Sequence, residues 1–155
     1  MIDVISHVNV WVDDQDEAKD FYTEKLGFEV REDATLEEFD GYRWLTVGPP
    51  GQPDVNIILS LPEPPPIDAE SAEQVKALLA KGAMGPGILR TSDCRKTIKE
   101  LEERGVEVIQ QPDERFYGID AAIRDPSGNE WRVSQPIEYD IGSVPGVHAA
   151  ESNSS

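Results

Sequence analysis

Four side chains from three segments of the chain have the chemistry to bind or transform a small molecule. His7 carries an imidazole, which can act as a general base or bind a metal ion. Arg90 and Arg132 carry guanidiniums, which need an acid, either Glu130 of the protein itself or an anionic group on a ligand. Whether these groups form one site depends on the strands that position them.

Alternating sequence patterns place these side chains on strand faces opposite the apolar ones. In residues 6–14, SHVNVWVDD, valines occupy every second position and predict a buried face, so the residues between them point the other way. The same alternation applies to the later strands, and nearby aromatic residues add stacking surfaces. The expected ligand-binding residues are His7, Asn9, Trp11, Trp44, Asn56, Ile88, Arg90, Phe116, Tyr117, Glu130 and Arg132.

Several of these assignments have a plainer alternative. Trp11 and Trp44 would also suit ordinary core packing. The arginines would suit a structural ion pair with Glu130, and His7 would suit a hydrogen bond that serves no reaction.

The chain contains two copies of a β-α-β-β-β pattern. In the first copy Asp13 or Asp14 caps a helix that ends at Gly27, and three strands follow. In the second copy Asp93 caps a helix that ends at Gly105, and the turn DPSGN joins the last two strands. We therefore expect an α+β fold of tandem βαβββ modules.

The expected boundaries follow from changes in composition. The proline cluster after residue 61 cannot continue a sheet, but DAESAEQVKALLAKG has helical spacing and predicts a short, mobile helix that could cover a pocket. The predicted parts are a first module at 1–61, a linker at 62–85, a second module at 86–136 and a disordered tail at 137–155. The two modules together form one domain, 1–136.

Composition excludes several classes of partner. The 155 residues include 14 Lys and Arg against 31 Asp and Glu, for a formal net charge of −17. Nucleic acid binding needs clustered basic residues, so we expect no such partner. The chain has one cysteine and no apolar run of the ~20 residues that span a bilayer, so we expect a cytoplasmic protein that does not bind membranes.

Other familiar chemistries lack their residues. The segment GAMGPG is followed by a strand and lacks the lysine and helix of a phosphate-binding loop. Cys94 begins a helix, but its spacing to Ile98 and Leu101 predicts a core position. We assign no role to His148, which lies in the predicted tail.

Three segments resemble the vicinal oxygen chelate superfamily, which includes glyoxalase I, bleomycin-resistance proteins, fosfomycin-resistance proteins and extradiol dioxygenases. They are HVNVWVDDQDEAKDFYTEKLGFEV, SDCRKTIKELEERGVEV and RDPSGNEWRVSQP, and the resemblance covers residues 2–136. It implies a glyoxalase/bleomycin-resistance/dioxygenase fold whose modules form a curled mixed sheet around a cup. It also implies a homodimer, with a ligand or metal inside the cup.

The resemblance implies four metal-ligand positions, and this chain keeps one of them. Catalytic members hold a divalent metal with His or Glu on four strands. The corresponding residues here are His7, Ile58, Pro86 and Arg132, and only His7 can bind a metal. Because Arg132 is a permanent cation, we expect no metal and no other cofactor. Under the alternative of a shifted last strand, His7 and Glu130 would hold a divalent metal.

Three functional hypotheses remain at this stage. The first is a protein that binds a small molecule in the cup without a metal, in a sequestration or resistance role. The second is a metal-dependent lyase, isomerase or dioxygenase with an unusual ligand set. The third is a metal-free enzyme with His7 as its catalytic base, or an inactive scaffold. We favour the first, and the sequence leaves open whether any reaction is catalysed.

Overall fold

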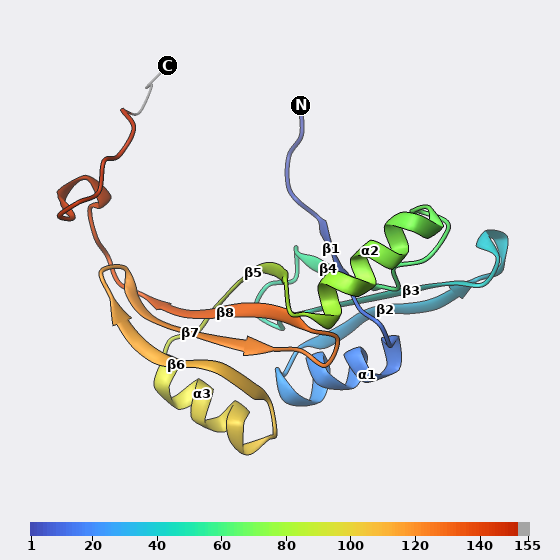
Figure 1. Ribbon diagram of the computed structural model, residues 1–155, viewed down its shortest axis with the longest axis horizontal. Helices are drawn as coiled ribbons and strands as arrows, with labels where there is room; N and C mark the ends of the chain where they lie inside the picture. The colour runs from blue at the N-terminus through green and yellow to red at the C-terminus, as the bar shows by residue number, and fades with distance from the viewer. Residues whose placement is uncertain (152–155) are drawn as a thin grey trace.

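A computed structural model describes residues 1–151 and shows an α+β fold built from two β-α-β-β-β modules (Figure 1). In the first module, the helix α1 continues as a π-helical turn, η1, before the chain enters the second strand. The elements are β1 (His7–Trp11), α1 (Gln15–Asp20), η1 (Phe21–Lys25), β2 (Glu29–Leu36), the 3-10 turn η2 (Glu37–Phe39), β3 (Tyr42–Gly48) and β4 (Asn56–Ser60).

The second module repeats this order. Its elements are β5 (Met84–Arg90), α3 (Cys94–Glu103), β6 (Glu107–Arg115), β7 (Gly118–Arg124) and β8 (Asn129–Pro136). Each module forms its own four-stranded mixed sheet, with the strand order β1-β4-β3-β2 in the first and β5-β8-β7-β6 in the second. The expected tandem arrangement is confirmed.

Helix ends follow the expected capping residues. Asp14, one of the two candidates, accepts a hydrogen bond from the Glu17 backbone N–H, and Asp93 does the same for Lys96. Gly27 and Gly105, which end the two helical segments, have φ values of 77° and 82°, a conformation that favours glycine. Cys94 is completely buried in the core, as its spacing predicted.

The connection between the modules contains the helix α2 (Ala69–Ala80), capped by Asp68. Two of its residues, Ala72 and Leu79, are buried, and the rest of the helix is mostly exposed. In the described part of the C-terminal segment, a 3-10 turn, η3 (Ile141–Ser143), follows β8. Residues 152–155 of the predicted tail lie outside the described residues. Within residues 1–151, no helix is long and apolar enough to cross a membrane.

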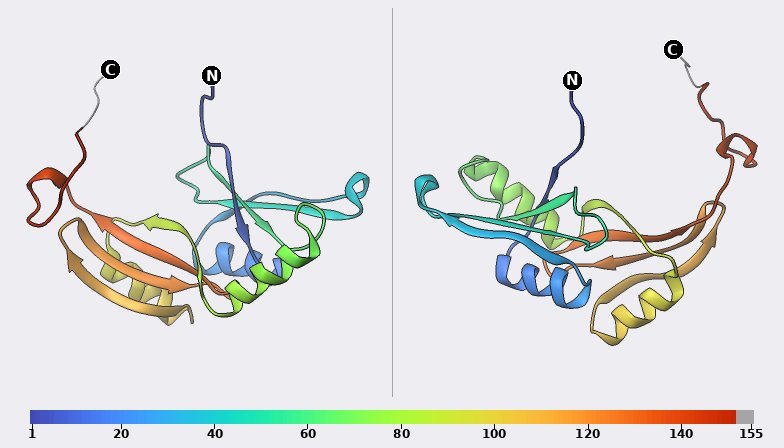
Figure 2. Two further views of the ribbon diagram at one scale, coloured as in Figure 1. Left: turned by 45° about the horizontal axis from the view of Figure 1, so that its top comes forward. Right: turned by 180° about the vertical axis from the view of Figure 1, so that it is seen from behind.

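The two sheets lie side by side, with α1 and α3 on the same side of them (Figures 1 and 2). The N-terminal and C-terminal segments extend from the other side (Figure 1). We call the faces turned away from α1 and α3 the open faces of the sheets. Side chains on the opposite faces form the core, so residues that alternate with core residues lie on the open faces.

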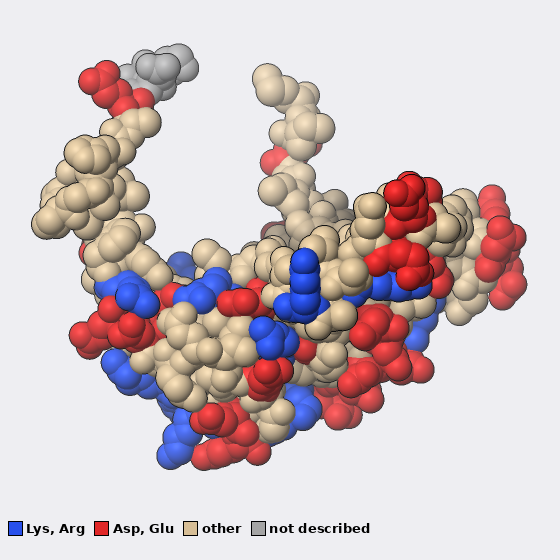
Figure 3. All heavy atoms as spheres, in the orientation of Figure 1, with Lys and Arg blue, Asp and Glu red and all other residues tan. Residues whose placement is uncertain are grey.

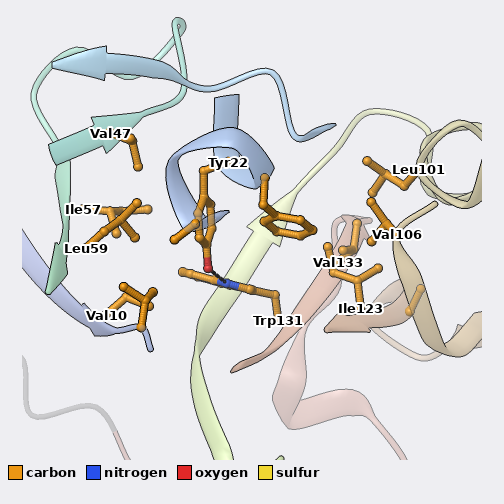
Figure 4. Close-up of a cluster of buried hydrophobic side chains, with 14 of the residues drawn as sticks. Val10, Tyr22, Val47, Ile57, Leu59, Leu101, Val106, Ile123, Trp131 and Val133 are labelled. Atoms are coloured by element: carbon orange, nitrogen blue, oxygen red, sulfur yellow. Dashed lines mark hydrogen bonds between the residues drawn. The ribbon is translucent and has the colours of Figure 1, made fainter. Parts of the chain in front are cut away.

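One continuous core joins the modules. Tyr22 follows α1 in the first module, and Trp131 lies on β8 of the second (Figure 4). The Trp131 indole N–H donates to the Tyr22 hydroxyl oxygen at 2.8 Å, and that hydroxyl donates to Asp125 Oδ2 at 2.7 Å. Burial raises the pKa of Tyr22 well above its usual value, which keeps the hydroxyl protonated as a donor.

The DPSGN turn has a structural role at this junction. The Asp125 carboxylate is buried and accepts hydrogen bonds from the backbone N–H groups of Ser127, Gly128 and Asn129. The Asn129 amide also donates to the Trp11 carbonyl oxygen at 2.8 Å. The turn therefore fixes the start of β8 to the first module and sets how the two open faces lie relative to each other.

Candidate functional site

The open face of the first sheet carries an aromatic groove. Trp44, on β3, stands beside His7, on β1, with their ring centroids 5.6 Å apart. On its other side Trp44 borders a hollow of about 370 Å³, a volume within the usual range for small-molecule pockets. The residues that line this aromatic groove are Leu36, Phe39, Tyr42, Trp44, Pro65 and Pro66.

The outer end of the aromatic groove is acidic. Phe39, in the 3-10 turn between β2 and β3, is flanked in sequence by Glu37, Glu38 and Asp40. Acidic side chains gather over this turn at one end of the molecule (Figure 3). A ring bound here would therefore lie near negative charge, which favours neutral or cationic substituents over anionic ones.

Three other predicted residues of the first sheet are hydrogen-bonded within the protein. The Ser60 hydroxyl donates to Asn9 Oδ1 at 2.5 Å, and the Asn56 side-chain amide donates to the Ser6 carbonyl oxygen at 3.1 Å. Trp11 is half-buried, and its carbonyl takes part in the junction described above. His7 is exposed, with Nδ1 at 3.0 Å from Ser6 Oγ.

The open face of the second sheet carries a polar cluster of Gln110, Tyr117, Asp120 and Arg132. Arg132 Nη2 donates to Asp120 Oδ2 and, at 2.9 Å, to Gln110 Oε1. The Tyr117 hydroxyl donates to the same Asp120 oxygen at 3.0 Å. Glu130, the partner expected from the sequence, is more distant, with Oε1 at 3.8 Å from Arg132 Nη1.

The electrostatics of the polar cluster keep its donors protonated. The hydrogen bond to Asp120 raises the pKa of the Arg132 guanidinium above its usual value. Burial first, and then the hydrogen bond to Asp120, raises the pKa of the Tyr117 hydroxyl. Both groups therefore donate to Asp120. Because Asp120 is only 3% exposed, its carboxylate obtains hydrogen-bond donors from the protein rather than from solvent.

The remaining predicted residues lie around the second sheet. Ile88, which is 70% exposed, lines a hollow of about 490 Å³ with Glu130, Arg132 and the segment 82–87. Ile88 and Arg90 also line a second hollow, of about 500 Å³, on the other side of β5. Phe116 stacks edge-to-face on Tyr117 and on Tyr139, with centroids 5.1 and 5.4 Å apart.

The structure thus brings the predicted residues together in two groups rather than one. The His7 ring lies beside the Trp44 ring on the first sheet. On the second sheet, Arg132 lies near Glu130 and lines one hollow with Glu130 and Ile88. Sequence reasoning missed Gln110 and Asp120, and it missed the groove residues other than Trp44. Asp120 had a usable signal, because it alternates with the apolar residues Ile119, Ala121 and Ile123 and therefore shares a face with Arg132.

The side chains at the four metal-ligand positions do not fit a divalent metal. Ile58 and Pro86 have no side-chain donor, and Arg132 is a cation held in place by Asp120. The alternative pair, His7 and Glu130, lies on different sheets. Over residues 1–151, no group of three or more His, Cys, Asp or Glu is arranged to hold a metal ion.

Comparison with known proteins gives a consistent result. Residues 4–133 match the model of the glyoxalase/bleomycin resistance protein/dioxygenase superfamily. An uncharacterised protein of Shewanella frigidimarina (strain NCIMB 400) is 32% identical over 131 residues, which cover 84% of this chain and 92% of the relative.

Two solved structures are similar over most of the chain. The crystal structure of UcmS2 has a TM-score of 0.81 and 44% identity, covering 87% of this chain and 99% of that one. The structure of TnmS3, described as an antibiotic binding protein from Streptomyces sp. CB03234, has a TM-score of 0.69 and 32% identity. That match covers 88% of this chain and 98% of TnmS3.

Proposed function

Because this chain belongs to the glyoxalase/bleomycin resistance protein/dioxygenase superfamily, we propose that it binds a small organic molecule on the open faces of its sheets without a resident metal. The role is sequestration of the kind that confers resistance. The observation that carries this proposal is Arg132, a permanent cation fixed by Asp120 and Gln110 at a position where the family's enzymes place a metal ligand. The description of TnmS3 as an antibiotic binding protein supports it.

The walls of the site indicate what kind of molecule binds. The aromatic groove offers ring surfaces and apolar contact, with acidic residues at its outer end. The second sheet offers fixed hydrogen-bond donors. Small-molecule sites combine these features, since apolar walls supply affinity and a few polar groups fix orientation. The proposed ligand therefore has a flat aromatic part and a polar part.

We also propose that the protein acts as a homodimer in the cytoplasm. The strands β1, β2, β5 and β6 are sheet edges, and the N-terminal residues Ile2, Val4 and Ile5 are exposed. A second copy would cover these apolar residues and complete the site around each open face. Light scattering should give twice the 17.2 kDa chain mass, and a monomer at micromolar concentration would contradict a dimer.

The binding role can be tested with flavone, a neutral flat aromatic molecule, in the presence of EDTA. We expect saturable binding that a chelator leaves unchanged. Replacement Trp44→Ala should weaken it about tenfold, equivalent to ~1.4 kcal/mol, because a stacking wall is lost. Trp44→Phe should keep most of the affinity. Tyr139→Ala, which removes an exposed aromatic residue from the segment between β8 and η3, is the matched control and should have no effect.

A metal-uptake experiment without chelator tests the metal-dependent alternative. Stoichiometric uptake of Mn²⁺, Ni²⁺ or Zn²⁺ that disappears in His7→Ala and Glu130→Gln variants would contradict a metal-free site. Absence of flavone binding in the native protein would count against the aromatic groove as a ligand site.

A further inference from the structure

We propose that Asp120 is a positioning residue that makes the second sheet selective for an uncharged oxygen acceptor, such as an amide, ketone or quinone carbonyl, over a carboxylate or phosphate. This inference rests on the proposed function and names the ligand group that Arg132 recognises. Arg132 differs from the arginines of anion sites in how many of its donors are available to a ligand. In an anion site the guanidinium binds the ligand in a bidentate manner, through two parallel N–H···O hydrogen bonds.

One terminal nitrogen of Arg132, Nη2, already donates to groups within the protein. In the register of the second sheet, Ile88, Arg132, Ala122 and Gln110 lie side by side across the four strands. Arg132 Nη2 reaches over Ala122 to donate to Gln110 and to Asp120. Ala122 beneath this bridge is completely buried. The donors left for a ligand are Nε and Nη1.

Arg132 also lines a hollow that suits an uncharged molecule. The hollow has a volume of about 490 Å³, and its other walls are Ile88, Glu130 and the backbone of the segment 82–87, which contains three glycines. Ile88 provides an apolar surface, and Glu130 provides an acceptor 3.8 Å from Arg132 Nη1. A ligand carbonyl can accept from Arg132 while a neighbouring hydroxyl or amide N–H donates to Glu130.

The charges around the hollow disfavour an anion. The guanidiniums of β6, β7 and β8 are paired with carboxylates: Arg115 with Asp113, Arg124 with Glu107, and Arg132 with Asp120. The positive charge near the hollow is therefore balanced. Asp120 is almost completely buried, and solvent therefore screens its repulsion of an incoming carboxylate only weakly. The net charge of −17 on the whole chain acts in the same direction.

A matched pair of probes tests this selectivity. 2-Naphthamide and 2-naphthoate share one ring system and differ in charge. We expect the native protein to bind the amide at least tenfold more tightly than the carboxylate. In Asp120→Asn, which keeps the side-chain shape but removes the charge, this ratio should fall at least fivefold because the carboxylate gains affinity.

The control is Asp113→Asn on the neighbouring strand. Asp113 pairs in register with Asp120, but it is exposed and forms its ion pair with Arg115. Its replacement removes the same charge and should leave the ratio unchanged. If Asp120→Asn does not fold, Arg132→Lys serves instead, because a single ammonium cannot hold Asp120 and Gln110 and still present a fixed fork, so the ratio should also fall.

Specific outcomes would overturn the inference. Native protein that binds 2-naphthoate as tightly as 2-naphthamide, or that binds neither probe, would contradict it, as would an unchanged ratio in Asp120→Asn. Tight binding of 2-naphthoate would leave the proposed binding function intact. Failure of that function would instead appear as absent flavone binding in the native protein.

Discussion

The open faces of the two sheets differ in chemistry although the sheets share one strand order. The first presents the aromatic groove around Trp44, whereas the second presents the polar cluster around Arg132. The two modules therefore share a scaffold but carry different side chains on their open faces. A molecule that contacts both faces needs an aromatic part for the first and a neutral hydrogen-bonding part for the second.

The two sheets also differ at the positions where the family's enzymes hold a metal. On the first sheet, His7 keeps a donor and Ile58 has none. On the second sheet, Pro86 has none, and Arg132 brings a positive charge together with its own buried counter-ion. An ion would be unfavourable near Arg132 even if one further ligand were restored elsewhere, since the guanidinium stays charged.

The two faces depend on one shared junction, and breaking it should have the largest effect. Asp125→Ala removes an acceptor for the Tyr22 hydroxyl and for three backbone N–H groups, all of them buried. Unsatisfied buried donors are costly, so we expect a loss of about 3 to 5 kcal/mol in the free energy of unfolding. Urea denaturation measures this, and binding at both faces should fall together.

Asp113→Ala is the control for this prediction, because Asp113 is exposed and should contribute less than about 0.5 kcal/mol. A loss of flavone binding in Asp125→Ala with unchanged binding of 2-naphthamide would indicate that the two faces do not share this junction.

A double-mutant cycle at Asp120 and Arg132 sharpens the comparison at the second sheet. Asp120→Ala leaves the guanidinium without its main acceptor, and Arg132→Met leaves a buried carboxylate without its main donor. Each single change should destabilise by about 1 to 3 kcal/mol, and the double variant by less than their sum. Strict additivity in thermal or urea unfolding would show that the pair is not coupled.

Local features of the fold were predictable from the sequence, whereas contacts between distant segments were not. The aspartate caps and the terminating glycines lie within a few residues of the helices they delimit, so Asp14, Asp93, Gly27 and Gly105 were identified correctly. The π-helical turn at Phe21–Lys25 was missed, because the spacing of apolar residues there suits an α-helix equally well.

The candidate site shows the same limit. Strand alternation identified the open-face residues of single strands, but not which of them meet. Glu130 was one of two acids considered for Arg132, the other being a ligand, because Glu130 and Arg132 share one face of a strand. Asp120 and Gln110 on neighbouring strands are the nearer partners. The aromatic groove combines the turn after β2 with prolines after β4, and only the folded chain brings these together.

The smallest predicted effect concerns an ion pair of the first sheet that solvent reaches. Asp33 accepts from Arg43 Nε and Lys19 Nζ, both at 2.9 Å, and joins α1 to β2 and β3 on the side opposite the open face. Hydrogen bonds from Arg43 first, and then from Lys19, hold the pKa of Asp33 well below its usual value. Its contribution to stability is therefore full above the unfolded pKa of ~3.9 and is lost as the pH falls below that.

Asp33→Asn should lower the free energy of unfolding by about 0.2 to 1 kcal/mol at pH 7, since both partners are about one quarter exposed and solvent screens the pair. The difference from the native protein should shrink in 1 M salt and between pH 4 and pH 2, which urea denaturation across that range measures. The Asp120–Arg132 pair, with Asp120 buried, should respond less to salt. An equal salt response of the two pairs would mean that burial of Asp120 does not protect its ion pair from screening.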